Sequence, residues 1–237
     1  MRAIGAASNA GQLRDLLADA AKHIGCLYFA LTQHVDLRGG ASDLIPLHNY
    51  PADWSRWFIA HRLATRDPVH RACRRTAAGF LWREVPKLLA LTADDHMVFE
   101  RARRMGLGDG LTIPANVPGE PGGSVSFATA VGGLLPDLAM PFAQSIGVFA
   151  FERARKLHRV CPSDAAARLT DRQRECILWV ARGKTDWEIA QILGVSPVTV
   201  IEHLRNARAR YGVPSRAVLP VRALFDGALT FDDIFAR

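Results

Sequence analysis

The chain has 237 residues, of which 49% are hydrophobic and 22% are charged, and its formal net charge is +7. The apolar content excludes an intrinsically disordered chain, and the length suits one large domain or two ordinary ones. The basic charge fits a polyanionic partner, such as nucleic acid or a membrane surface, but it would equally serve solubility alone.

The sequence indicates neither a membrane segment nor a metal site. The first 13 residues lack the apolar run of a signal peptide, and no apolar stretch is long enough to cross a bilayer. No two of the four cysteines form a C-x-x-C pair, and the eight histidines show no metal-ligand spacing; the cysteines are Cys26, Cys73, Cys161 and Cys176. We therefore expect a cytoplasmic protein with free thiols and no metal.

Hydrophobic periodicity predicts helices alternating with strands up to about residue 158. The predicted helices cover residues 9–24, 52–66, 92–105 and 141–157. Strands are predicted over residues 25–32 and twice within 110–130, on either side of a Pro/Gly turn. The apolar residues of the last helix fall roughly on one face; they are Phe142, Ile146, Phe149, Ala150 and Leu157. This part is therefore predicted to be an α/β or α+β domain spanning residues 1–158.

Residues 159–168, RVCPSDAAAR, are predicted to be a linker, because proline and small residues separate two periodic segments there. Everything in 169–237 is predicted to be helical. Two short helices, 170–182 and 185–193, precede a third that begins with Ser196 as N-cap and Pro197 in its first position. The fold class is therefore α+β with an all-α C-terminal domain.

The third C-terminal helix has one apolar and one mixed face. Its apolar residues are Val200, Leu204, Ala207 and Tyr211, and its other face carries Val198, Ile201, Glu202, Arg205 and Arg208. The cap, the tight turn and the basic front are typical of a helix-turn-helix whose last helix enters the major groove of DNA. Arginines there can reach phosphates or guanines, the glutamate can accept from cytosine, and the aliphatic residues can pack on thymine methyls. The alternative is a three-helix bundle with a solvated arginine face.

Residues 169–212 resemble the DNA-binding domain of LuxR-type transcription regulators. The matching residues are Leu169, Thr170, Arg172, Glu175, Gly183, Lys184, Thr185, Glu188, Ile189, Ala190, Thr199, Val200, His203 and Asn206, and the sequence departs from the family at Gln173, Ile201, Glu202, Arg210 and Tyr211. The departures leave the operator sequence open. The expected DNA contacts are Lys184, Val198, Thr199, Ile201, Glu202, Arg205 and Arg208. Pro220 predicts a kink near Leu219 in the final helix.

The N-terminal domain offers a candidate pocket made of aromatic residues around one acid: Tyr50, Trp54, Trp57, Phe58, Asp67 and Trp82. An aromatic stripe at helical spacing is more often core than ligand site. A buried carboxylate among rings needs a partner, however. The alternative for Asp67 is a capping or surface role before Pro68.

Residues 49–69, together with Trp82, 110–114 and 122–126, look like the acyl-homoserine-lactone-binding domain of quorum-sensing LuxR-type receptors. This resemblance implies an α/β/α sandwich that holds the ligand between the sheet and helices. It implies that Trp54 donates to the lactone carbonyl and that Asp67 accepts the amide N–H. The remaining implied roles are an approach of Tyr50 and Ser126 to the acyl carbonyl, packing of Trp82 on the ring, and a position for Gly123 beside the ligand.

Two departures leave the ligand open. Phe58 stands where the family typically has tyrosine, and His70 where an aliphatic residue is common; a lone histidine is more often a satisfied core or surface group than a ligand contact. The ligand is either an acyl-homoserine lactone or an aromatic or plant-derived molecule, or the protein acts without one. No cofactor other than this small-molecule signal is expected.

We therefore expect a ligand-responsive transcription regulator that binds a pseudo-palindromic double-stranded DNA operator as a homodimer. An enzyme is a rival, but the sequence has no P-loop, dinucleotide fingerprint, G-x-S-x-G or H-E-x-x-H motif, and residues 92–102 fit a helix start better than a catalytic cluster. A phosphorylation-controlled response regulator would need an acidic pocket and a partner lysine, and the sequence shows no such group.

Overall fold

The computed structural model describes residues 1–34, 46–117, 122–158 and 169–235. They form two compact units, one N-terminal to residues 159–168 and one C-terminal to them. The predicted linker, 159–168, lies outside the described residues, and so does Cys161. Within the described ranges, no helix is both long and apolar enough to span a bilayer.

The first unit is built on a five-stranded antiparallel sheet with the strand order β2-β1-β5-β4-β3. The strands are β1 (Tyr28–Gln33), β2 (Pro46–His48), β3 (Phe80–Leu81), β4 (Leu107–Ala115) and β5 (Gly123–Ala130). Ala30 in β1 pairs with His48 on one side and with Ser126 on the other, and Ser126 pairs in turn with Thr112. This register aligns one row of side chains across four strands.

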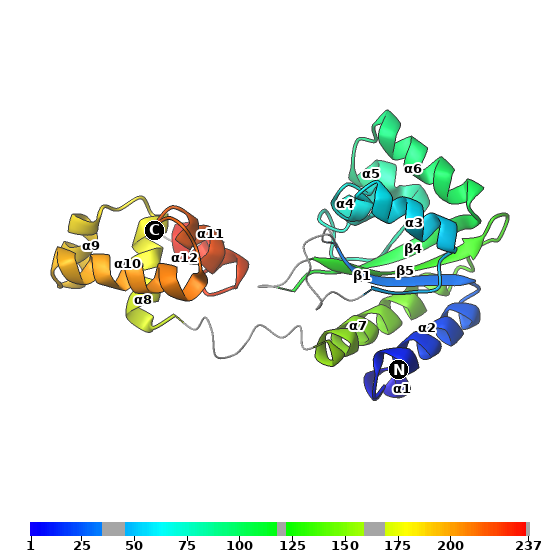
Figure 1. Cartoon of the computed structure of the whole chain (residues 1–237), viewed down its shortest axis with the longest axis horizontal. Coiled ribbons are helices and arrows are strands. Elements are labelled where there is room, and N and C mark those ends of the chain that lie inside the picture. Colours follow the sequence, from blue (N-terminus) through cyan, green and yellow to red (C-terminus); the bar gives the residue numbers. More distant parts are fainter. Residues whose placement is uncertain (35–45, 118–121, 159–168, 236–237) are drawn as a thin grey trace. The chain divides into compact units, whose positions relative to one another are not determined.

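Helices cover both faces of this sheet (Figure 1). One face carries α1 (Arg2–Gly5), α2 (Ala10–His23) and α7 (Ala139–Leu157); the other carries α3 (Ala52–Ala60), α4 (Pro68–Ala72), α5 (Val85–Leu88) and α6 (Ala93–Arg104). Phe29, Leu31 and Phe127 are fully buried in the main core, together with residues of α2 and α7. The expected α/β/α sandwich is confirmed.

Two of the predicted helices begin with side-chain caps. The Asn9 side chain accepts from the Gln12 amide at 2.9 Å and starts α2. Thr92 and Asp95 form a reciprocal capping box at the start of α6. These bonds satisfy amides that the first helical turn leaves without partners. The predicted helices, 9–24 and 92–105, start at these capping residues.

The predicted helix over 52–66 is wrong in its second half. The helix α3 ends at Ala60, Arg62 adopts a left-handed conformation with φ of 54°, and a short 3₁₀ turn follows at Leu63–Thr65. A left-handed residue other than glycine is uncommon and ends a right-handed helix. The break turns the chain so that Asp67 becomes the N-cap of a separate helix, α4.

The apolar face expected for α7 is only partly right. Phe142 and Phe149 are 56% and 50% exposed, while the buried face consists mainly of small residues: Ala139, Ala143, Gly147, Ala150, Phe151 and Ala154. A Cβ on Gly147 would lie 3.0 Å from the Cβ of Ile113 in the sheet. The helix backbone therefore lies so close to the sheet that only small side chains fit over most of the contact.

The second unit is a helical bundle of α8 (Asp171–Ala181), α9 (Asp186–Leu193), α10 (Pro197–Tyr211), α11 (Val218–Phe225) and α12 (Phe231–Phe235). The first three begin with side-chain caps from Thr170, Thr185 and Ser196. Gly194 has a φ of +64° and forms the turn between α9 and α10. Its core includes Ile177, Ile189, Val200, Leu204, Ala207 and Leu219.

The kink predicted at Pro220 is wrong. The helix α11 begins only at Val218, so Pro220 lies in its first turn, where the missing amide hydrogen has no acceptor within the helix. Leu219 is completely buried in the bundle core. A proline that would break a longer helix is therefore compatible with this one.

Candidate functional site

A cavity lies between the sheet and the helices α3, α4 and α6, with roughly 1040 Å³ of space between atoms including its open mouth. Six of the residues expected at a ligand site line it: Tyr50, Trp54, Phe58, Asp67, Trp82 and Ser126. Most of the remaining wall is apolar and includes Ala30, Val69, Val98 and Leu107. The cavity therefore offers a few polar groups in an otherwise apolar enclosure, which is the usual character of a small-molecule site.

A chain of hydrogen bonds fixes one wall. The Trp82 indole Nε1 donates to the Thr112 hydroxyl at 2.9 Å, and the Thr112 and Ser126 hydroxyls lie 2.8 Å apart. A Cβ on Gly110 would lie 2.6 Å from the Trp82 ring, so glycine at that position lets the ring lie against β4. Thr112 was not singled out from the sequence, although strand alternation with Gly110 could have assigned it to the same face.

Asp67 is only 5% exposed and has two functions in the structure. Its Oδ1 accepts from the His70 amide at 3.0 Å, which caps α4, and the residue also lines the cavity. Burial raises the pKa of the Asp67 carboxyl above its ordinary value, while His70 and the backbone amides of His70 and Val69 oppose the rise. One side chain thus both caps α4 and lines the cavity.

Tyr50 faces the same part of the cavity. Burial raises the pKa of its hydroxyl, the Asp67 charge adds to the rise, and the Ser126 side chain opposes it. The phenol therefore stays neutral at physiological pH and keeps a hydrogen to donate. A neutral donor and a carboxylate acceptor side by side suit a neutral ligand with both a carbonyl and an N–H group.

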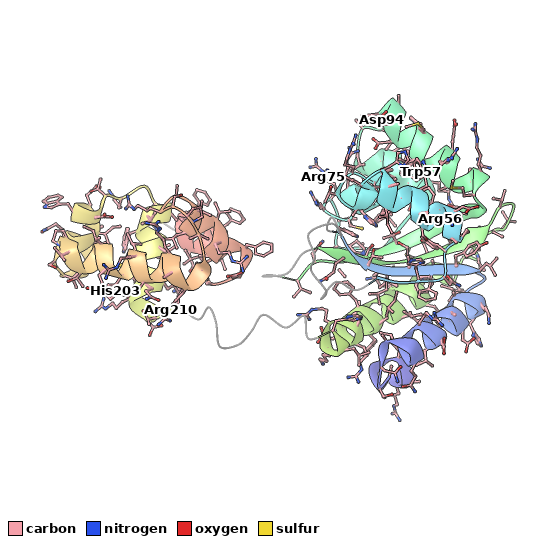
Figure 2. All side chains as sticks on the ribbon, in the orientation of Figure 1. Arg56, Trp57, Arg75, Asp94, His203 and Arg210 are labelled. Carbon is pink, nitrogen blue, oxygen red and sulfur yellow. The ribbon has the colours of Figure 1, made fainter. Side chains whose placement is uncertain are left out.

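Of the three aromatic residues of α3, Trp54 and Phe58 line the cavity and Trp57 does not. Trp54 is 6% exposed and its ring centroid lies 5.8 Å from that of Phe58. Trp57, labelled on α3 in Figure 2, does not line the cavity. The guanidinium of Arg101 lies 5.8 Å from its ring centroid. The interpretation of Trp57 as part of the pocket was therefore wrong, because three residues on one helix face need not reach the same cavity.

Gly123 is not beside the cavity. A Cβ there would collide with the Phe151 ring of α7 and lie 2.8 Å from the Thr32 carbonyl oxygen. Successive strand residues point to opposite faces, so Gly123 faces α7 while Ser124 and Ser126 face the other way. The position that the resemblance implied for Gly123 is corrected: this glycine permits close helix packing.

His70 lines the cavity and stacks on His34, with ring centroids 3.8 Å apart and planes inclined by 15°. The His34 Nε2 and the Ser124 hydroxyl are 2.9 Å apart. Burial, with smaller contributions from His70 and Arg74, lowers the pKa of His34 to about 2, so its imidazole is neutral. No motif in the sequence singles out His34; only the folded chain brings the two rings together.

The helix α10 presents the exposed face that the sequence predicts. Val198 and Ile201 are 71% and 53% exposed, and Glu202 and Arg205 form an exposed ion pair at 3.0 Å. His203 and Arg210 belong to the same helix (Figure 2). A short helix with exposed aliphatic and charged groups can contact both base edges and phosphates.

The other predicted DNA contacts have partners within the unit. The guanidinium of Arg208 donates to the Pro214 carbonyl at 2.5 Å, and Lys184 pairs with Glu188 at 3.0 Å. The hydroxyls of Thr199 and Ser196 are 2.8 Å apart at the start of α10. Val198, Ile201, Glu202 and Arg205 therefore form the exposed face, and Arg208 is tied to the turn that follows the helix.

The described residues contain no group of three or more histidine, cysteine or acidic side chains that could hold a metal ion. Cys26, Cys73 and Cys176 are buried free thiols, and burial raises the pKa of both Cys26 and Cys73 to about 12. Thiols of this kind are unreactive at physiological pH.

Two family models match the chain in succession. The autoinducer binding domain matches residues 9–154, and the luxR family of bacterial regulatory proteins matches residues 167–223. The chain belongs to the LuxR family. This LuxR-type protein is a ligand-binding transcription regulator: its first unit carries the cavity and its second the helix-turn-helix.

Individual relatives of the chain are also LuxR-type transcription regulators. The quorum sensing-dependent transcriptional regulator RpaR of Rhodopseudomonas palustris is 32% identical over 193 residues, which is 80% of this chain and 77% of RpaR. The transcriptional activator LuxR of Aliivibrio fischeri is 25% identical over 92% of this chain and 88% of its own. These LuxR-type relatives are regulators of transcription, in agreement with the expectation that the chain is not an enzyme.

The fold of this LuxR-type regulator is also found in solved structures. A crystal structure of Escherichia coli SdiA has a TM-score of 0.71 and 22% identity, and the match covers 94% of this chain and 93% of SdiA. A structure of SdiA in complex with octanoyl-rac-glycerol has a TM-score of 0.66 and 21% identity, covering 92% of this chain and 89% of that one. At these identities the likeness extends to the fold alone.

Proposed function

We propose that this regulator binds an N-acyl-homoserine lactone in its cavity and, as a homodimer, controls transcription at a pseudo-palindromic operator. The observation that carries the proposal is the buried Asp67 carboxylate, which lines an apolar cavity together with Trp54 and Tyr50. Asp67 accepts the ligand amide N–H, Trp54 donates to the lactone carbonyl, and Tyr50 and Ser126 approach the acyl carbonyl. Trp82 packs on the lactone ring, and the apolar wall holds the chain.

Thermal unfolding of the ligand-free, full-length protein tests this function directly. A ligand at a hundred times its dissociation constant stabilises the native state by about 2.7 kcal/mol. For a protein of this size, that corresponds to a rise in Tm of about 5–10 °C. We expect such a rise with at least one member of a panel of acyl-homoserine lactones. Octanoyl glycerol and aromatic acids are tested separately as alternative ligands. A rise in Tm with these compounds but with no lactone would contradict the lactone proposal.

Phe58 supports a second candidate, an aromatic or more apolar ligand. It lines the cavity and lies edge-on to His70 at 5.6 Å, so the wall beside the polar groups has no hydroxyl at this point. If the ligand is a lactone with a carbonyl in reach, Phe58→Tyr should leave binding unchanged or tighten it by about 0.5–1.5 kcal/mol. If the ligand is apolar there, the buried hydroxyl should weaken binding by about 1–3 kcal/mol. Titration of both proteins with the lactone panel and an aromatic panel decides between them.

The proposed operator is read by the exposed face of α10. Val198 and Ile201 pack on thymine methyl groups, and Arg205 contacts a phosphate or a guanine edge. Arg205→Ala should weaken DNA binding and, if Arg205 meets a phosphate, reduce the slope of log K against log salt by about one unit. Arg14→Ala removes another exposed arginine, from α2 of the first unit, and is the control. Equal slopes for Arg205→Ala and the wild type would contradict a phosphate contact.

Homodimerisation is proposed because one recognition helix reads only a few base pairs. Two-fold pairing lets two copies read half-sites about 34 Å apart, or a multiple of this spacing. The candidate interfaces are α7, which exposes Phe142 and Phe149, and α11, which exposes Val221. At saturating ligand, we expect light scattering of the complex with operator DNA to give a protein mass of two chains. If α7 forms the interface, Phe142→Asp should reduce the fraction of dimer. A single chain on the operator would contradict the proposal.

A further inference from the structure

Two stacked imidazole rings lie at one end of the cavity. Thr32 and His34 follow Ala30 at alternate positions along β1 and the residue after it, so all three side chains lie on the cavity face of the sheet. Ala30 and Thr32 line the cavity, and so does His70, whose ring centroid is 3.8 Å from that of His34. His34 is 5% exposed and is not itself part of the lining. The ring of His70 is therefore the surface that a ligand meets, and His34 supports it from behind.

Hydrogen bonds hold both rings in place. The His34 Nε2 lies 2.9 Å from the Ser124 hydroxyl, and the His34 amide donates to the Gly122 carbonyl at 2.7 Å. The Nδ1 of His70 lies 2.9 Å from the Ala64 carbonyl oxygen, which can only accept, so Nδ1 carries a hydrogen and donates it. Burial lowers the pKa of His34 to about 2, so its ring is neutral and packs on the second imidazole without repulsion between two cations. Neither ring can move aside without losing a hydrogen bond.

The proposed position of the lactone determines which way the acyl chain runs. Trp54, which the proposed function places at the lactone carbonyl, packs in one core cluster with Val98 and Leu107, and all three line the cavity. The lactone then occupies this part of the cavity, and the acyl carbonyl lies near Ser126. The acyl chain is left with the opposite part, which ends at the two stacked rings.

The sheet register limits the length of this part. Ala30 pairs with Ser126, and His34 follows four residues later in the chain. At about 3.3 Å per residue, His34 lies roughly 13 Å along the strand from the row that contains Ser126. A chain carbon stops about 4 Å short of a ring, at van der Waals contact, which leaves roughly 9 Å. An extended chain advances about 1.2 Å per bond, so no more than about eight carbons fit before the wall.

We propose that the stacked rings of His34 and His70 form the end wall of the acyl-chain site and restrict the ligand to lactones with acyl chains of about eight carbons or fewer. A longer chain has to push the His70 ring off His34 or break its bond to Ala64, because the supporting ring is anchored in the sheet. Overfilling a packed site typically weakens binding by roughly 5- to 150-fold. This inference rests on the proposed lactone function and specifies the length of the ligand's tail.

The test is a calorimetric titration of the full-length protein with butanoyl, hexanoyl, octanoyl and dodecanoyl homoserine lactones. The wild type should bind the dodecanoyl compound roughly tenfold or more weakly than the best of the shorter ones. His70→Ala removes the wall but keeps the backbone amide that bonds to Asp67, so it should bind the dodecanoyl compound at least as tightly as the octanoyl one.

Two control variants separate the wall from other effects of the substitution. His70→Phe keeps an aromatic ring but loses the hydrogen bond to Ala64, and it should retain the length limit of the wild type. His48→Ala removes another cavity-lining histidine, whose ring centroid lies 6.2 Å from that of Tyr50, and it should also retain the limit. If His70→Ala does not fold, His70→Val, a smaller truncation, takes its place.

The contrary outcomes are distinct. If the wild type binds the dodecanoyl lactone as tightly as the octanoyl one, the cavity has no such wall and the proposal is wrong, whether or not the variants fold. If the wild type shows the limit but the truncation of His70 leaves it unchanged, or His48→Ala abolishes it equally, the stacked rings do not set it and the proposal is again wrong. If no lactone binds the wild type, the proposed lactone function itself fails, and the inference about the tail fails with it.

Discussion

Replacing Asp67 by asparagine is expected to abolish the transcriptional response to ligand while the protein stays folded. The amide oxygen can still accept from the His70 amide and cap α4, but the negative charge in the cavity is lost. A hydrogen bond to a charged group contributes about 1.5–3 kcal/mol, so ligand affinity should fall by roughly 10- to 150-fold. Reporter dose-response curves and ligand titrations measure the loss directly. Asp67→Ala should have at least this effect on binding, together with a loss of stability from the missing cap.

Asp95→Asn is the matched control for this result. Asp95 is also a buried acid, 3% exposed, in a capping box at the start of a helix, but it does not line the cavity. Its Oδ1 accepts a hydrogen bond from the Arg71 guanidinium at 2.7 Å, so replacing Asp95 should lower the free energy of unfolding. The half-maximal ligand concentration should stay the same. If Asp67→Asn and wild-type curves coincide, Asp67 is a capping residue and nothing more.

Leu204→Ala is expected to destabilise the helix-turn-helix unit by about 2–5 kcal/mol. Leu204 is 4% exposed and belongs to the core of the unit, where the truncated side chain would leave a cavity that the neighbouring helices cannot fill. A loss of this size is a large part of the stability of an ordinary domain. Thermal and urea unfolding measure it, and DNA binding should weaken because less of the unit is folded.

Ile201→Ala separates the two faces of the same helix. Ile201 is 53% exposed, so its truncation should change stability by no more than about 0.5 kcal/mol. If its side chain packs on a thymine methyl, however, the preference for thymine at one operator position should decrease, as measured by binding to a set of singly substituted sites. A large loss of stability in this variant, or an unchanged base preference, would contradict the assignment of Ile201 to the DNA-facing surface.

The helix-turn-helix was predictable from sequence because its signals are local. The caps Thr170, Thr185 and Ser196 bond to amides three residues ahead, and Gly194 supplies a left-handed turn within the same short segment. Each of these interactions depends on neighbouring residues. A pattern in the sequence therefore carries nearly all the information that the local structure needs.

Predictions failed where the outcome depends on packing. The helical pattern continues on both sides of Arg62, and nothing local reveals its left-handed backbone. In α7, hydrophobicity alone assigned Phe142 and Phe149 to the apolar face, but the short distance to the sheet selects small residues for most of that contact. Hydrophobic patterns tell which residues can be buried; the separation between elements decides which of them fit.

The sequence by itself determined the family, the two units and six of the residues that line the cavity. The tertiary structure alone decided that Trp82, Thr112 and Ser126 form one hydrogen-bonded chain, that Gly123 faces α7, and that His34 stacks on His70. These contacts join strands and helices that are far apart in the chain. They depend on strand register, and a shift of one residue would turn every such side chain to the opposite face of the sheet.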